Sequence, residues 1–104
     1  MRWKRTEREV AHALGTSRLP NTGRAQPDII AGPFAIEHKM RTTLPRWLLD
    51  ALAQARRNAR PDQTPIVILT HPRGQGRKPL RLVVLAFEDW VAWHGPLEGT
   101  DAKP

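Results

Sequence analysis

The stretch Pro27-Asp28-Ile29-Ile30-Ala31-Gly32-Pro33-Phe34-Ala35-Ile36-Glu37-His38-Lys39-Met40 decides the predicted fold. Two short apolar runs, residues 29–31 and 34–36, flank the pair Gly32-Pro33, and a breaker pair between such runs indicates a β-hairpin. Gly accepts a positive φ and Pro requires a negative one, so the pair suits a type II′ two-residue turn. This turn fixes a register that pairs Ala31 with Phe34, Ile30 with Ala35, Ile29 with Ile36 and Asp28 with Glu37.

Three charged side chains are expected on one side of this hairpin. Directly opposed residues share a side of the sheet, which groups Asp28 with Glu37, and the period of two adds Lys39. The other side carries Ile29, Ala31, Phe34 and Ile36, which we expect to face a core.

The convergence of two carboxylates and an ammonium indicates a metal site. Two carboxylates held face to face repel one another unless a cation lies between them. Mg²⁺ binds through one or two carboxylates and keeps several waters. An ammonium beside it stabilises developing charge or orients a water. The predicted chemistry is therefore metal-assisted attack of water on a phosphodiester.

Composition favours a small basic protein that binds a polyanion. The chain of 104 residues supports one domain, and its net charge of +7 suits nucleic acid, although arginine richness also arises from genomic base composition. The chain contains no cysteine, and its four histidines lack the spacing of a zinc site. No long apolar run is present, so we expect a cytoplasmic protein without a membrane partner.

Residues 6–14 are predicted to form a helix that begins with a capping box of Thr6 and Glu9. Glu7 lies three residues before Val10 and seven before Leu14, so it belongs to the apolar stripe. A carboxylate on that stripe needs a partner such as a metal ion or a lysine. The alternative is that Glu7 lies in solvent, where it favours the first turn through the helix dipole.

The order of these motifs resembles that of the PD-(D/E)xK nuclease superfamily, and in particular archaeal-type Holliday junction resolvases and their phage relatives. The resemblance covers residues 4–90 and rests on Thr6-Glu7-Arg8-Glu9-Val10, Thr22-Gly23, Pro27-Asp28-Ile29-Ile30-Ala31-Gly32 and Ile36-Glu37-His38-Lys39. It implies an α/β restriction-endonuclease-like core with a mixed sheet flanked by helices.

The resemblance also implies a function. Glu7, Asp28 and Glu37 would hold Mg²⁺, with Mn²⁺ as a substitute, and Lys39 would orient the attacking water. The expected activity is endonucleolytic cleavage of DNA, selective for four-way junctions or other branched DNA, by a homodimer of phage or host origin. A domain of residues 1–94 would be followed by a disordered tail, residues 95–104.

Two further segments are candidate DNA contacts. The loop of residues 15–26 contains Arg18, Thr22 and Arg24, and the resemblance implies a substrate contact for its hydroxyl, although Thr22 also suits an ordinary turn. The glycine-rich loop of residues 71–79 contains Arg73, Arg77 and Lys78, which would bind phosphates or remain a solvated turn.

The remaining chain predicts two helices and two strands. A helix over residues 46–59 carries Gln54, which either reaches the scissile region without binding the metal or is a solvated or capping amide. Residues 65–70 predict a strand buried on both faces and parallel to residues 34–40, and residues 80–86 predict another strand. Residues 88–93 predict a short helix whose tryptophans cover the core.

Two rival functions remain open at this level. One is a restriction, repair or generic nicking nuclease on the same fold, although 104 residues leave little room for a target-recognition domain. The other is a non-enzymatic basic DNA-binding protein in which the acidic residues are structural.

Overall fold

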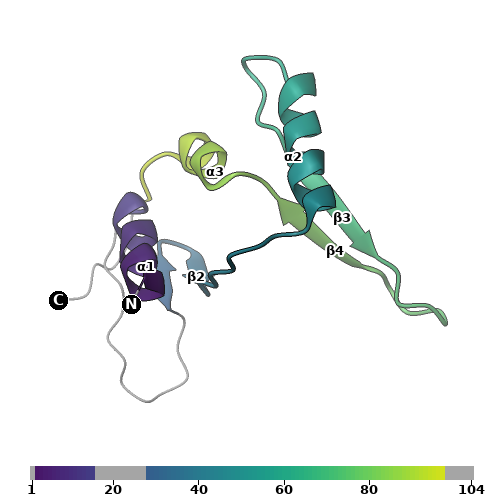
Figure 1. Cartoon of the computed structure of the whole chain (residues 1–104), viewed down its shortest axis with the longest axis horizontal. Helices are drawn as coiled ribbons and strands as arrows, with labels where there is room; N and C mark the ends of the chain where they lie inside the picture. The colour runs from purple at the N-terminus through teal and green to yellow at the C-terminus, as the bar shows by residue number, and fades with distance from the viewer. Residues whose placement is uncertain (1, 16–27, 98–104) are drawn as a thin grey trace. The chain divides into compact units, whose positions relative to one another are not determined.

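The computed structural model describes residues 2–15 and 28–97, and the side chains from residue 5 onward in the first of these ranges (Figure 1). The elements follow the order α1 (Arg2–Ala13), β1 (Ile29–Ala31), β2 (Phe34–Ile36), α2 (Arg46–Asn58), β3 (Val67–His71), β4 (Leu80–Val84) and α3 (Phe87–His94). The chain divides into two compact units, which are described separately below. The first unit comprises Met1–Thr42 and His94–Pro104, and the second comprises Thr43–Trp93.

The predicted hairpin is present in the first unit, where three of the four predicted pairs form and the pair of Asp28 with Glu37 lies beyond the paired strands. β1 pairs antiparallel with β2 through Ile29 with Ile36, Ile30 with Ala35, and Ala31 with Phe34. Gly32 in the turn has φ +56°, the region that glycine enters without the penalty a Cβ would impose. The breaker pair Gly32-Pro33 therefore predicted both the turn and the pairing.

The predicted capping box is wrong, because α1 begins at Arg2 rather than at residue 6. Thr6 lies inside the helix, where the backbone N–H groups already donate to carbonyls of the preceding turn. A capping side chain at this position therefore has no free N–H group to accept from. Glu9 instead lies 3.9 Å from Arg5, one helical turn earlier, and both side chains are exposed. Such an exposed pair contributes little to stability.

The helical stripe and the inward side of the hairpin supply the core of the first unit. On α1 the buried residues are Glu7, Ala11 and Leu14, at the spacing of one helix face, and on β1 they are Ile29 and Ala31. The ring of Phe34 lies 6.2 Å, between ring centroids, from that of His94. The apolar side of the hairpin is therefore the predicted one.

The second unit contains two helices linked by an ion pair. α2 ends within one residue of its predicted limit, and its apolar stripe packs against β3. Arg56 near the end of α2 donates to the carboxylate of Asp89 on α3 at 2.7 Å. The predicted short C-terminal helix is confirmed as α3.

β3 and β4 form a second antiparallel hairpin, in which Val67 pairs with Val84 and His71 with Leu80. The predicted parallel pairing is wrong for the described strands, which form two separate two-stranded sheets. The prediction that residues 65–70 are buried on both faces is also wrong, since Ile68 is 57% exposed. An apolar run matches a central strand in composition, but here the run belongs to an edge strand of a small ribbon.

The described architecture is therefore mixed α/β, with three helices and two small antiparallel sheets. Within residues 2–15 and 28–97, no helix has the length and apolar character needed to cross a membrane.

Candidate functional site

A backbone-to-carboxylate hydrogen bond closes the open end of the β1–β2 hairpin. The N–H of His38 donates to Oδ2 of Asp28 at 2.9 Å in a half-buried environment. Asp28 and Glu37 each lie one residue beyond the last paired residues, Ile29 and Ile36. The carboxylate of Asp28 thus contacts the Glu37-His38-Lys39 segment through the backbone of His38.

The burial pattern of this segment continues the alternation of the strand. From residue 34 to residue 39, half-buried and exposed positions alternate, and Glu37 and Lys39 are both exposed. Residues of equal parity in an extended chain point to the same side. Glu37 and Lys39 are therefore at the exposed positions of this alternation, whereas Asp28, the third residue predicted for this side, is half-buried.

Glu7, unlike the exposed Glu37 and Lys39, is buried, with only 2% of its surface exposed. It lies on the inward stripe of α1, which confirms the predicted orientation and excludes the solvated first-turn alternative. Its neighbour Thr6 places Oγ1 4.0 Å from the sulfur of Met40, next to Lys39 in sequence. This turn of α1 therefore lies beside the end of the Glu37–Met40 segment.

The three carboxylates predicted to bind a metal do not form one group. Within the described parts of the chain, no set of three or more His, Asp or Glu side chains is arranged to hold a metal ion. Glu7 is buried on α1, whereas Glu37 is exposed just beyond the end of β2. The donor chemistry suits Mg²⁺, but the arrangement does not by itself make a coordination site.

His38 is a residue of this segment that the sequence analysis did not assign. Besides the backbone bond to Asp28, its ring atom Nδ1 is buried, and no described group makes a hydrogen bond with it. Its sequence position could have identified it. His38 lies between Glu37 and Lys39, so in an alternating segment its side chain points to the opposite, less exposed side.

The predicted DNA contacts are distributed over different parts of the chain. Arg18, Thr22 and Arg24 lie outside the described residues. Gln54 is exposed on α2, and Arg73, Arg77 and Lys78 are exposed in the loop between β3 and β4, so all four belong to the second unit.

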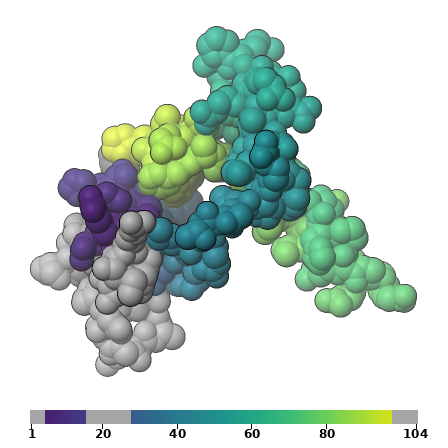
Figure 2. Space-filling view, viewed as in Figure 1, coloured from purple at the N-terminus to yellow at the C-terminus, as the bar shows by residue number. Residues whose placement is uncertain are grey.

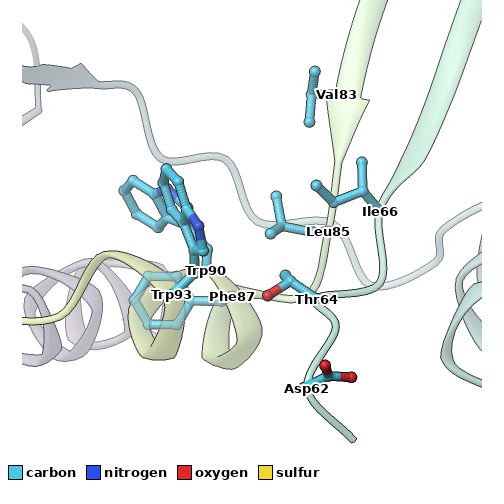
Figure 3. Close-up of a pocket in the computed structure, with 8 residues that line it drawn as sticks. All are labelled: Asp62, Thr64, Ile66, Val83, Leu85, Phe87, Trp90 and Trp93. Atoms are coloured by element: carbon cyan, nitrogen blue, oxygen red, sulfur yellow. The ribbon is translucent and has the colours of Figure 1, made fainter. Parts of the chain in front are cut away.

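The second unit also contains an open apolar groove of about 830 Å³ that includes none of the motif residues. Figure 3 shows Phe87, Trp90 and Trp93 of α3 on one side and Ile66, Val83 and Leu85 at the strand ends on the other. Val83 is 63% exposed and Trp93 is 68% exposed. Among the described residues that line this groove, Asp62 is the single charged one.

No family model, curated protein or solved structure matches this chain. The functional proposal therefore rests on the motif residues and on their geometry within the first unit.

Proposed function

We propose that this chain is a Mg²⁺-dependent DNA endonuclease that acts on branched DNA such as a four-way junction. The observation that carries the proposal is the hydrogen bond from His38 to Asp28, which holds the Asp28 carboxylate against the Glu37-His38-Lys39 segment. The full restriction-endonuclease-like core is part of the same proposal.

Contacts within the first unit support a shared site. The Asp28 bond joins the start of β1 to the segment after β2, and the Thr6–Met40 contact joins α1 to the end of that segment. Three sequence stretches that each carry one motif carboxylate are thereby held in one compact unit. A buried glutamate is also uncommon in a small core unless it has a charged or hydrogen-bonding role.

The residue types suit hydrolysis of a phosphodiester. A divalent ion held by carboxylates supplies a Lewis acid that activates water and stabilises charge on the phosphate. Glu7, Asp28 and Glu37 are the proposed oxygen donors, and Oδ2 of Asp28 is already oriented by the His38 N–H. The exposed ammonium of Lys39, on the side of Glu37, can hold a water or a phosphate oxygen.

Selectivity for branched DNA and a homodimeric state are proposed together. A resolvase cuts two strands of a near-symmetric junction, and an isologous dimer presents two equivalent sites. The exposed apolar side chains of the second unit, which include Ile68, Val83 and Trp93, offer a surface for such a dimer.

A second candidate function is a non-enzymatic DNA-binding protein. It is favoured by one observation, namely that Asp28 already accepts a structural hydrogen bond from the backbone of His38. A nicking nuclease without preference for junctions is the enzymatic alternative.

Cleavage of a labelled four-way junction and of a linear duplex with the same arm sequence separates these candidates. We expect Mg²⁺-dependent cuts near the branch point and much slower cutting of the duplex. Equal cutting of both substrates indicates a generic nicking nuclease. Binding without cutting, in Mg²⁺ and in Mn²⁺, supports the non-enzymatic candidate. Calorimetric titration of Mn²⁺ into wild type and Asp28→Asn shows independently whether the carboxylates bind an ion.

A further inference from the structure

The tip of the β3–β4 hairpin concentrates positive charge without any compensating acid. Between Asp62 and Glu88 the sequence contains no acidic residue, and its cations are Arg73, Arg77, Lys78 and Arg81. All four side chains are exposed. Figures 1 and 2 show this tip, in green, extending beyond α2 of the same unit.

The tip is held in one conformation by bonds within the loop. Nε of Arg73 donates to the carbonyl of Lys78 at 2.7 Å, and the N–H of Arg77 donates to the carbonyl of Gly74 at 2.9 Å. On the flanking strands, Nε of Arg81 donates to Oγ1 of Thr70 at 3.3 Å. Of the four cations, the side chains of Arg73 and Arg81 take part in these bonds, which restrain them before any ligand binds and lower the entropic cost of binding.

The backbone of the tip is left-handed over three consecutive residues. Gly74, Gln75 and Gly76 have φ of +69°, +50° and +71°. A Cβ added at either glycine would meet no atom within 4 Å, so packing does not require glycine at these positions. What requires glycine is the left-handed conformation, and the open space lets a ligand approach the backbone closely.

We infer that this tip, residues 71–81, is a preformed binding element for the phosphate backbone of duplex DNA, separate from the carboxylate-bearing unit. Arginine and lysine side chains in a fixed arrangement are suited to phosphates, whereas sequence readout needs contacts with base edges. A two-stranded ribbon is also one of the elements that the major groove of B-DNA, about 12 Å wide, admits.

The composition of the tip favours a duplex over a single strand. Proteins that bind single strands without sequence preference stack bases on aromatic side chains. Residues 71–81 contain no Phe, Tyr or Trp. Apart from Thr70, the paired residues of the ribbon outside the tip are apolar, so most of its polar groups lie in the tip. That the polyanion is DNA follows from the proposed function, and the inference rests on it in this one respect.

The test measures binding of the full-length protein to a fluorescein-labelled duplex in EDTA, so that no cleavage contributes. We expect the double variant Arg77→Gln/Lys78→Gln to lower the slope of log K against log[NaCl] by about 0.9 for each cation removed. The matched control is Arg46→Gln, whose cation already lies 3.3 Å from Asp50 on α2 of the same unit. This control should leave the slope unchanged.

A second variant tests the fixed conformation without changing charge. Gly76→Ala places a Cβ on a left-handed residue, so we expect several-fold weaker binding and a lower thermal unfolding midpoint, with the protein still folded at the temperature of the binding measurement. Gln75→Gly keeps the left-handed backbone accessible and should bind as wild type does.

Three outcomes overturn the inference: a wild-type salt slope in Arg77→Gln/Lys78→Gln, an equal loss in Arg46→Gln, or equal affinity for a single strand or an RNA duplex. Its failure is distinct from that of the nuclease proposal. Tip variants that bind as wild type does leave metal-dependent cleavage untouched, and an inactive wild type can still bind duplex through the tip.

Discussion

The carboxylate of Asp28 accepts a hydrogen bond from the backbone N–H of His38 at 2.9 Å. Asp28 lies one residue before β1 and His38 lies two residues after β2, so the bond closes the open end of the hairpin. Through this bond Asp28 stabilises the hairpin, and that contribution is independent of any metal binding by its carboxylate. Variants that retain the bond and variants that remove it can therefore separate the two roles.

Asp28→Ala should lower the free energy of unfolding by about 1.5 kcal/mol, because a charge-assisted hydrogen bond is lost. Asp28→Asn keeps an acceptor oxygen for the His38 N–H and should lose less than half as much. Urea unfolding followed by circular dichroism measures both values. Hydrogen exchange at the His38 amide should accelerate in Asp28→Ala only, and equal acceleration in both variants contradicts the assigned acceptor.

Gly32→Ala should lower the free energy of unfolding by about 1 to 2 kcal/mol, because a Cβ is strained at the φ of +56° found in this turn. Pro33→Ala is the matched control in the same turn, and it removes only conformational restriction from the unfolded chain. We expect it to cost less than about 1 kcal/mol. Chemical denaturation at equilibrium compares the two, and a larger loss in Pro33→Ala would be inconsistent with the left-handed Gly32.

Glu7→Gln should reduce metal-dependent cleavage by about 100-fold or more, the scale on which loss of a placed charge acts in active sites. Duplex binding in EDTA should change little, since Glu7 is buried and its proposed role is to hold the metal ion. Glu9→Gln is the control on the same helix. Its exposed pair with Arg5 should contribute less than about 0.5 kcal/mol, and its cleavage rate should remain that of wild type. If Glu9→Gln lost cleavage and Glu7→Gln did not, the two assignments would be reversed.

Val83→Glu should convert the proposed dimer to a monomer, because it places a charge among exposed apolar side chains of the groove. Trp47→Glu, on the exposed surface of α2 and outside the groove lining, is the control. Light scattering of both variants and of wild type measures the mass in solution. A wild-type mass equal to that of one chain excludes the dimer.

Local patterns predicted the local structure well. The breaker pair Gly32-Pro33 specified the turn and the register of the first hairpin, because a two-residue turn leaves no freedom in pairing. The spacing of Glu7, Val10 and Leu14 predicted the inward face of α1, on which Glu7 and Leu14 are buried and Val10 is half-buried. The start of α1 was missed, since residues 2–5 carry charges that fit an exposed helix and a loop equally well.

Relations between distant segments were harder to predict. The apolar run at residues 65–70 has the composition of a central parallel strand, yet Ile68 is exposed and β3 pairs only with β4 among the described strands. Pairing partners depend on tertiary contacts that no local period encodes. The candidate site was predicted incompletely for the same reason. The alternation of side chains along the segment placed Glu37 and Lys39 together, but it says nothing about their distance from Glu7 on another element.

The most direct measurement for the nuclease proposal is nicking of a supercoiled plasmid by wild type and Asp28→Asn, in Mg²⁺ and in EDTA. Asp62→Asn, which removes an exposed carboxylate 3.7 Å from Arg60 in the second unit, is the matched control. We expect relaxation by wild type and Asp62→Asn in Mg²⁺, none in EDTA, and about 100-fold slower relaxation by folded Asp28→Asn. Equal rates for Asp28→Asn and wild type, or relaxation that persists in EDTA, would contradict a metal-dependent nuclease built on Asp28.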